Sequence, residues 1–257
     1  MPDVVNQGVR IHYEVEGDGP PLVLQHGFHT SLQMWRESGY VEALKNDYRL
    51  ILLDARGRGA SAKPHDPKAY GMRLIVRDIT AVMDHLNIGR AHYFGYSMGG
   101  LIGFGVAKYA PSRFHSLILG GASPYKPDPQ RMDQQVEALR KGMEAEVAFM
   151  EQRLGRMTPE RKARMLSNDP EALIAATMAL RDEAWFEDVL PTMTMPCLVF
   201  AGDADVGYHG VEECVKHMPN VTFFSLPGCD HGQAMQLDLV LPHVTPFLAR
   251  VSQLVRT

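Results

Sequence analysis

Residues 91–109 read AHYFGYSMGGLIGFGVAKY, and this stretch decides the fold. The residues up to Tyr96 form an apolar run, which is typical of a strand covered on both faces of a sheet. The residues after Ser97 continue as a helix. A strand that turns directly into a helix forces the residue at the bend into a strained conformation, and Gly95 and Gly99 leave room for the close approach. The sequence therefore places one serine hydroxyl above the end of a strand.

The pattern G-x-S-x-G around Ser97 indicates a nucleophile. The N–H of Met98 begins the helix and points into the space above the strand, where a helix N-terminus favours developing negative charge. On the motif alone, an ordinary serine in a glycine-rich turn is an equal alternative, and the position between a strand and a helix favours the nucleophile. The glycines do not form a dinucleotide site, because GFGVAK at 103–108 lies inside the helix rather than at its start.

Further apolar runs along the chain predict the other strands. An amphipathic helix is predicted over 72–89 and ends at Gly89. This alternation of strands and helices predicts an α/β fold with a doubly wound, mostly parallel sheet. A run that alternates apolar and polar residues predicts a half-exposed strand near the sheet edge, and it begins at Val9. Near-continuous apolar runs predict the buried strands, and they begin at Pro21, Tyr48, Ala91, Phe114, Pro196 and Val221.

The alternation stops between 123 and 190, where no strand-like run occurs. We expect this segment to form a small helical cap inserted into a core made of residues 1–122 and 191–257. The apolar spacing predicts one long amphipathic helix over 127–155.

Two more cap helices are predicted to start after Thr158 and Asp169, each of which precedes a proline at the first helical position. The segment is rich in methionine. These side chains either fill gaps in the core of the cap or line an adaptable apolar pocket.

Composition excludes several classes of partner. The 257 residues carry a net charge of −4 without a long run of either sign, so neither nucleic acid nor an anionic membrane is an expected partner. The cysteines, Cys197, Cys214 and Cys229, are odd in number, which argues against a disulfide framework. The N-terminus lacks a basic start followed by an apolar run, and no apolar stretch is long enough for a bilayer. We therefore expect a cytoplasmic protein.

A serine nucleophile needs a base, and the imidazole needs an acid to fix its tautomer. His231 follows the last predicted strand, in a loop expected to converge with Ser97 above the sheet. Asp203 and Asp205 both follow the preceding strand and give the chain order Ser, Asp, His. Asp205 is preferred because it lies further along the loop, and Asp203 is expected to cap the turn. The choice between them stays open.

Chemistry at a carbonyl also needs donors for an oxyanion. The stretch LQHGFHT ends a strand at Gln25, and the N–H of Phe28 is expected to pair with that of Met98. His26 is expected to brace the loop. A metal site at His26 and His29 is disfavoured, because no carboxylate or third ligand has the needed spacing. We expect no metal and no organic cofactor.

At this point several motifs together resemble the α/β-hydrolase superfamily in their order and spacing. They are HGF at 26–28, DARGRGAS at 54–61, GYSMGG at 95–100, AGDAD at 201–205 and the histidine of GCDHG at 228–232. The resemblance implies an eight-stranded, mostly parallel sheet with helices on both faces and a lid after the sixth strand. It also implies a triad of Ser97, Asp205 and His231, oxyanion amides at Phe28 and Met98, and a structural role for Asp54.

The GYSMGG form is similar to small esterases, enol-lactone hydrolases and cofactor-free haloperoxidases. A serine at 97 speaks against the family members that use a carboxylate nucleophile, such as dehalogenases and epoxide hydrolases. Two positions depart from the family pattern: Asp230 stands where glycine is common, and no proline follows Asp205. If the Asp230 carboxylate approached His231, it would raise the pKa of that imidazole.

The sequence therefore predicts a hydrolase that cleaves a small-molecule carboxylic ester or lactone through an acyl-enzyme. Perhydrolysis, C–C bond hydrolysis and acyl transfer on the same triad are alternatives, as is a lyase that uses His231 as a base. A non-catalytic ligand receptor on the same scaffold is an alternative of a different class.

Overall fold

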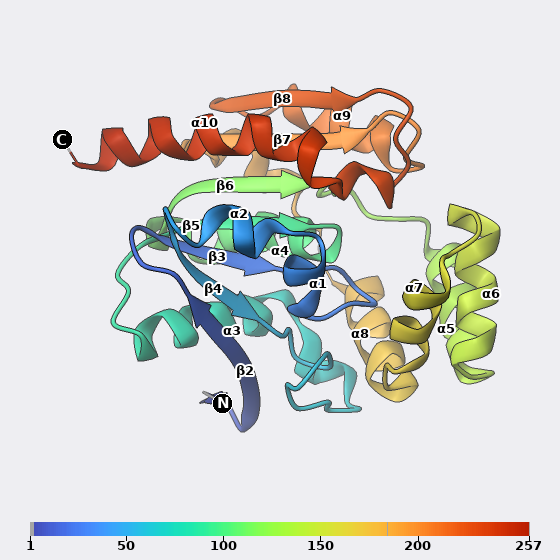
Figure 1. Ribbon diagram of the computed structural model, residues 1–257. Coiled ribbons are helices and arrows are strands. Elements are labelled where there is room, and N and C mark those ends of the chain that lie inside the picture. The colour runs from blue at the N-terminus through green and yellow to red at the C-terminus, as the bar shows by residue number, and fades with distance from the viewer. Residues whose placement is uncertain (1–2, 184, 257) are drawn as a thin grey trace.

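The computed structural model describes residues 3–183 and 185–256. Within these residues the strands form an eight-stranded sheet in the order β1-β2-β4-β3-β5-β6-β7-β8 (Figure 1). The first two pairings, β1 with β2 and β2 with β4, are antiparallel, and all the others are parallel. The strands are β1 (Asp3–Asn6), β2 (Val9–Glu16), β3 (Pro21–Gln25), β4 (Arg49–Leu53), β5 (Ala91–Tyr96), β6 (Phe114–Gly120), β7 (Cys197–Gly202) and β8 (Val221–Leu226). The predicted α/β class and mostly parallel sheet are confirmed.

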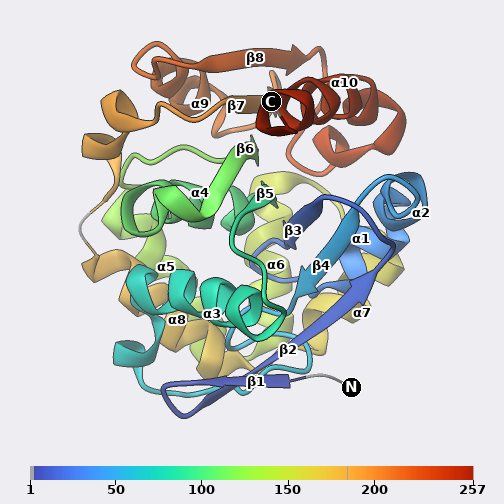
Figure 2. The same cartoon turned by 90° about the vertical axis from the view of Figure 1, so that its left-hand side faces the viewer.

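Helices cover both faces of the sheet (Figure 2). One face carries α1 (Gln33–Glu37), α2 (Tyr40–Leu44) and α10 (Leu237–Arg256), and the other carries α3 (Met72–His85), α4 (Met98–Tyr109) and α9 (Tyr208–Val215). Successive strand residues point to opposite faces, so β3 contributes Val23 to one apolar cluster and Leu22 and Leu24 to the other. Short 3₁₀ helices span Pro67–Tyr70, Pro111–Arg113, Glu187–Thr192 and Gln233–Met235.

The outermost strand, β1, is an element that the apolar runs did not predict. It is four residues long and half exposed, so it carries no strong hydrophobic signal. It pairs with β2 through a tight turn at Gln7 and Gly8, which have φ angles of 49° and 79°. Two successive residues with positive φ are typical of a hairpin turn that matches strand twist. The strand predicted to lie near the sheet edge is β2, and it lies next to the edge strand as expected.

The helix predicted over 72–89 ends earlier than expected. α3 ends at His85, and Asn87 takes a positive φ of 55°, so the chain leaves the helix before it reaches Gly89. Asparagine tolerates this left-handed conformation better than most residues, which makes it a common helix terminator.

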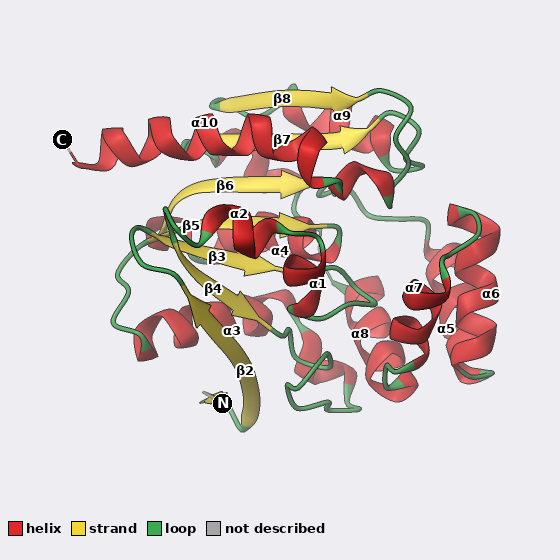
Figure 3. Ribbon diagram, in the orientation of Figure 1, coloured by secondary structure: helices red, strands yellow, loops and turns green. Residues whose placement is uncertain are grey.

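The helices α5 (Pro129–Arg140), α6 (Met143–Leu154), α7 (Pro159–Leu166) and α8 (Pro170–Asp182) lie between β6 and β7 in the chain. They sit beyond the carboxyl ends of the parallel strands (Figures 1 and 3). We propose residues 123–190 as the cap. Thr158 and Asp169 accept hydrogen bonds from the backbone N–H groups of Arg161 and Ala172, so α7 and α8 start where the sequence predicted.

The prediction of one long helix over 127–155 is wrong. The chain forms two helices, α5 and α6, which are separated at Gly142. Gly142 has a φ of 106°, a conformation that only glycine adopts at low cost. The apolar spacing continues across the break because Val136, Leu139 and Met143 share one cluster with α8.

A buried ion pair fixes the loop after β4 to α3. The guanidinium of Arg56 donates from Nε and Nη2 to the two carboxylate oxygens of Asp78, both at 2.7 Å. Asn6 donates a further hydrogen bond to Asp78, which ties β1 to the same group. Burial raises the pKa of Asp78 against the opposing effect of Arg56. The carboxylate therefore depends on its partner to remain charged inside the protein.

We expect the Arg56→Met substitution to lower the free energy of unfolding by about 3–5 kcal/mol, because it leaves a buried carboxylate without a counter-ion. The matched control is Lys108→Met, which removes an exposed ion pair with Asp188 and should cost less than about 1 kcal/mol. Urea unfolding of both variants measures the difference. Equal losses in the two variants would show that Arg56 and Asp78 do not act as a buried pair.

Candidate active site

Ser97 lies at the turn between β5 and α4, with φ of 57° and ψ of −117°. Its N–H donates to the carbonyl of Gly120 at 2.8 Å, and its carbonyl accepts from Leu101 at 3.0 Å. The flanking glycines are required by close approach. A Cβ on Gly95 would lie 2.2 Å from the carbonyl oxygen of Gly99, and one on Gly99 would lie 2.0 Å from that of Gln25. The backbone on either side of Ser97 therefore leaves no room for a side chain at position 95 or 99.

Loops from three different strands bring Ser97, His231 and Asp205 together. The Ser97 Oγ lies 2.9 Å from Nε2 of His231, and Nδ1 of the same ring lies 2.5 Å from Oδ2 of Asp205. A carboxylate only accepts hydrogen bonds, so Nδ1–H must donate to Asp205 and Nε2 is left to accept from the serine hydroxyl. This is the arrangement in which an imidazole can take a proton from an alcohol.

Asp205 is mostly buried, yet it remains an anion. Burial raises its pKa, but the hydrogen bond and charge of His231 and the N–H of Gly207 outweigh burial, so the pKa lies below its ordinary value. The Gly207 N–H donates to Oδ1 at 2.9 Å. One oxygen is thus held by the backbone and the other by the imidazole, which fixes the orientation of the ring.

The two candidate acids have different surroundings. The Asp203 carboxylate accepts a hydrogen bond from the N–H of Gly228 at 2.7 Å and bridges the loops after β7 and β8. Asp205 alone of the two contacts His231 among the described residues. The geometry therefore favours Asp205 as the orienting acid.

The Asp230 side chain caps its own turn. Its Oδ1 accepts from the N–H groups of Gly232 and Gln233, both at 2.8 Å. Within the described residues it makes no hydrogen bond to His231, so the approach considered from the sequence does not occur.

Tyr96 holds the histidine loop in place, a role that sequence reasoning missed. Its hydroxyl donates to the backbone carbonyl of His231, and its ring centroid lies 5.3 Å from the imidazole. Burial raises the pKa of Tyr96 well above its ordinary value, so the phenol stays a donor. The signal available in the sequence was that Tyr96 comes directly before Ser97 in the motif.

Two backbone amides next to Ser97 are free to act as donors. Within the described residues, the N–H groups of Phe28 and Met98 make no hydrogen bond. Gly27 packs against the serine, since a Cβ there would lie 3.5 Å from that of Ser97. Phe28 and Ser97 line the same pocket. This is the setting expected for an oxyanion site.

The buried guanidinium of Arg58 fixes Phe28 and was not predicted. Its Nε donates to the Phe28 carbonyl, and its Cζ lies 4.4 Å from the centroid of the Phe28 ring. Burial lowers the pKa of Arg58 to about 10, so it remains a cation near neutral pH. The motif DARGRGAS contained the residue, but its contact lies 30 positions away in the chain.

His26 braces the loop between β3 and α1, as the sequence predicted. Its Nδ1–H donates to the carbonyl of Gly27 at 2.7 Å, and its Nε2 accepts from the N–H of Ala55 at 3.1 Å. Burial lowers the pKa of His26 to about 4, so the ring is neutral. Asp54 holds the same region, because its two carboxylate oxygens accept from the N–H groups of Leu32 and Ala60.

His29 joins the oxyanion loop to the cap. Its Nε2–H donates to Oε1 of Glu146 in α6 at 2.8 Å, and Nε2 of Gln135 in α5 donates to the same oxygen at 2.7 Å. Glu146 is fully buried, and its second oxygen has no hydrogen-bond partner among the described residues. The cap therefore contacts the residue that follows Phe28.

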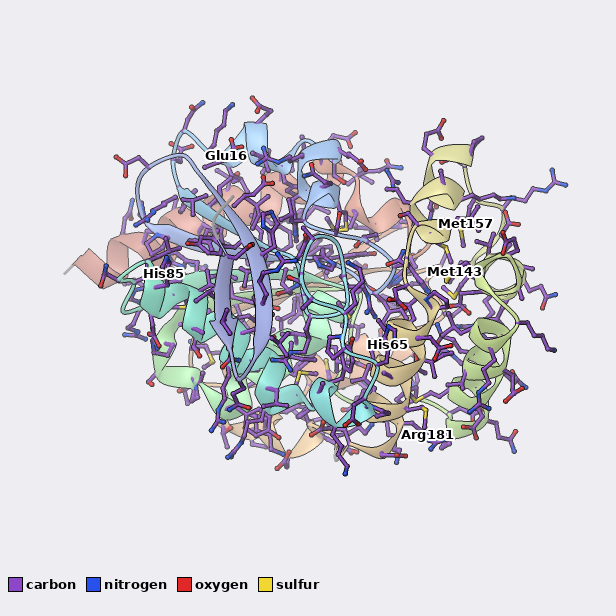
Figure 4. The ribbon with its side chains drawn as sticks, turned by 90° about the horizontal axis from the view of Figure 1, so that it is seen from below. Glu16, His65, His85, Met143, Met157 and Arg181 are labelled. Carbon is purple, nitrogen blue, oxygen red and sulfur yellow. The ribbon has the colours of Figure 1, made fainter. Side chains whose placement is uncertain are left out.

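His65 forms a second link between core and cap (Figure 4). Its Nε2–H donates to the carboxylate of Asp169, the residue that caps α8. This contact joins the loop after β4 to the start of the last cap helix.

A pocket of about 450 Å³ opens in front of Ser97. Core residues including Phe28 and His231 form one wall, and α5, α6 and α7 form the other. Met150 and Met165 line it, whereas Met143 and Met157 pack among the cap helices (Figure 4). Some cap methionines therefore line the pocket and others fill the core of the cap, so both alternatives occur.

Other kinds of site are not evident among residues 3–183 and 185–256. No three side chains of histidine, cysteine, aspartate or glutamate come together there in a way that could hold a metal ion. No helix in that part of the chain combines the length and apolar character that crossing a bilayer requires.

Comparison with known proteins gives a consistent family assignment. Residues 20–195 match the family model described as the alpha/beta hydrolase fold. The chain is 34% identical to 3-oxoadipate enol-lactonase 2 of Acinetobacter baylyi over 119 residues, which cover 46% of this chain and 43% of that protein. It is 32% identical over 159 residues to a putative 2-succinyl-6-hydroxy-2,4-cyclohexadiene-1-carboxylate synthase of Bacillus subtilis, covering 57% and 56%. The matches thus span about half the length of these curated relatives.

Solved structures resemble the chain over nearly its whole length. The enol-lactonase from Burkholderia xenovorans LB400 superposes with a TM-score of 0.87 at 24% identity, covering 96% of this chain and 100% of that one. A thermophilic esterase from Thermogutta terrifontis gives a TM-score of 0.85 at 25% identity, covering 97% and 98%. These likenesses support the fold.

The contacts of the two aspartates predict different effects on the reactivity of Ser97. We expect Asp205→Asn to slow covalent labelling of Ser97 by a fluorophosphonate by about 10³–10⁴-fold, because the ring loses the acceptor that fixes its tautomer. Asp203→Asn is the matched control and should label within about twofold of the wild-type rate. Intact-protein mass spectrometry over time measures both rates. Slow labelling of the Asp203 variant with a normal rate for the Asp205 variant would reverse the assignment.

Buried neutral histidines predict a loss of stability in mild acid. Burial lowers the pKa of both His26 and His92 to about 4, against an ordinary value of 6.5. As the pH falls from about 6.5 towards 4, the unfolded chain binds a proton at each site and the folded chain does not. The free energy of unfolding should therefore fall by about 1.4 kcal/mol per pH unit for each histidine.

The slope of the free energy of unfolding against pH, taken at pH 5.5 from urea unfolding curves, measures this proton uptake. The His92→Gln variant tests it, because its neighbours are the hydroxyls of Ser116 and Ser252, with which an amide can also hydrogen bond. We expect that variant to take up about one proton fewer on unfolding. An unchanged slope would show that His92 is protonated in the folded protein.

Proposed function

The chain belongs to the α/β-hydrolase fold family, and we propose that it is a serine hydrolase that cleaves carboxylic esters or lactones through an acyl-enzyme. The observation that carries this proposal is the hydrogen-bonded series from Ser97 through His231 to Asp205, all three of which line one pocket. The free amides beside Ser97 supply the second requirement of acyl transfer, a place for negative charge.

In the first half of the reaction, the Ser97 oxygen attacks the acyl carbon and its proton passes to Nε2 of His231. The N–H groups of Phe28 and Met98 stabilise the oxyanion of the tetrahedral intermediate. The C–O bond to the leaving group then breaks, and the imidazolium gives its proton to the departing alkoxide. The Asp205 carboxylate stabilises the imidazolium throughout, without itself taking the proton.

In the second half, a water molecule attacks the acyl-enzyme and gives its proton to His231. The tetrahedral intermediate collapses, the Ser97 oxygen leaves and recovers the proton, and the carboxylic acid is released. The whole cycle needs only this chain's side chains and water.

The similar proteins and the size of the pocket indicate the class of substrate. Similarity to an enol-lactonase and to an esterase supports ester or lactone substrates. The chain also matches bifunctional epoxide hydrolase 2 of Mus musculus, at 30% identity over 22% of that protein. The serine at position 97 favours ester chemistry over epoxide opening. Attack of a serine on an acyl carbon gives an ester that water can hydrolyse, whereas its attack on an epoxide would leave an ether on the enzyme. The size of the pocket supports a small-molecule substrate. The cytoplasmic location stays a prediction.

The direct test is hydrolysis of a panel of short-chain esters and lactones by the wild type and by Ser97→Ala. We expect wild-type turnover and a loss of at least about 10⁴-fold in kcat/KM in the variant, since the nucleophile is removed. Thr80→Ala is a control, because Thr80 lies on α3, outside the lining of the pocket, and its hydroxyl donates to the carbonyl of Arg77. Full activity in the Ser97→Ala protein would contradict the mechanism.

The rival functions give different outcomes in the same experiment. A receptor on this scaffold binds ligand without turnover in either protein. A lyase turns over without labelling of Ser97 by a fluorophosphonate. Perhydrolysis, C–C hydrolysis or acyl transfer leaves Ser97 reactive to that label while ester turnover is absent.

A further inference from the structure

The cap lines the pocket with cations. Arg131 from α5, Arg153 from α6, and Arg161 and Arg164 from α7 all border the pocket that contains Ser97. Within the described residues, the one carboxylate that lines the same pocket is Asp205, and both of its oxygens are already engaged by His231 and Gly207. The pocket therefore holds an excess of positive charge on its cap side.

These arginines differ in whether they have partners. Arg164 forms an ion pair with Glu37 at the exposed rim. Among residues 3–183 and 185–256, the guanidinium groups of Arg131, Arg153 and Arg161 form neither an ion pair nor a hydrogen bond. For Arg153 the contact observed is with the ring of Phe149, at 5.6 Å. Within the described residues, three cations thus line the pocket without a direct ion pair.

Arginines elsewhere on the cap do find carboxylates. Arg140, also in α5, pairs with Glu137. Arg181, which is labelled in Figure 4, lies in α8 and pairs with Asp133 and Asp182. Direct ion pairs with carboxylates are therefore common on the outer surface of the cap. At the pocket, the charges of Asp128 and Asp205 act on Arg131, and those of Glu146 and Asp205 act on Arg153, but within the described residues none of them forms a direct ion pair with these arginines.

The two arginines on α5 and α6 are close enough to affect one another. Burial lowers the pKa of Arg153, and the charge of Arg131 lowers it further. Burial also lowers the pKa of Arg131. Two like charges that act on one another raise the free energy of the protein, and an anion between them would relieve that repulsion.

We propose that Arg131 and Arg153 form a carboxylate subsite, so that the substrate is an ester or lactone bearing a second, ionised carboxylate remote from the scissile carbonyl. This inference rests on the proposed function of Ser97. Guanidinium groups bind carboxylates through paired N–H donors with a fixed geometry, which also orients the substrate. The cap then selects for charge while the core performs the chemistry.

The test compares monomethyl and dimethyl esters of succinic, glutaric and adipic acids. Each pair shares a chain length and a similar ester reactivity, and differs by one carboxylate. In a pH-stat assay we expect the wild type to favour the best monoester by at least about tenfold in kcat/KM over its diester. The Arg131→Gln/Arg153→Gln variant should bring that ratio close to one, and added salt should lower it in the wild type.

Arg140→Gln is the matched control, because it removes an arginine of α5 that pairs with Glu137 away from the pocket. It should keep the wild-type preference. A wild type without preference for the monoester, or a preference that survives in the double variant, would overturn the subsite.

A binding measurement separates this proposal from the proposed function. Titration of glutarate into Ser97→Ala by calorimetry needs no turnover. We expect binding that weakens at least about tenfold when Arg131→Gln and Arg153→Gln are added. If no ester is hydrolysed but this binding is found, the hydrolase proposal fails and the subsite stands. If esters are hydrolysed but glutarate binds equally to both proteins, the subsite fails and the hydrolase stands.

Discussion

Ser97 occupies a backbone conformation, φ of 57° and ψ of −117°, that residues with side chains rarely adopt. Such a conformation costs about 1–3 kcal/mol and persists only where its surroundings determine it. Here β5 is held between β3 and β6, and α4 packs closely enough that Gly95 and Gly99 tolerate no Cβ. The strain is what lifts the hydroxyl out of the sheet and places the first amide of α4 beside it.

The loops after β3, β7 and β8 complete the site around this turn, and each is held by its own contacts. Arg58 fixes Phe28, Tyr96 fixes the loop of His231, and Gly207 holds Asp205. The cap adds to the same arrangement through Glu146, whose buried carboxylate binds His29 next to the oxyanion loop. The strands therefore position the candidate catalytic groups, and the cap forms the other wall of the pocket in front of them.

Much of this could be predicted from the sequence, because parallel strands end at one edge and the loops that follow them must converge. That reasoning placed Ser97, Asp205 and His231 near one another, and the structure finds them within hydrogen-bond distance. It could not find Glu146, which lies 117 positions from its partner His29 on a helix whose surroundings depend on how the cap packs. The break at Gly142 was missed because apolar periodicity continues through it.

Detection of the acyl-enzyme tests the central claim most directly, because it asks whether the Ser97 oxygen forms a covalent bond with substrate. Rapid mixing with p-nitrophenyl acetate should release a burst of about one p-nitrophenol per chain before the steady state, and acid-quenched protein should carry an acetyl group on the peptide that contains Ser97. Turnover without a burst and without that modified peptide would contradict the account if quenching were faster than deacylation.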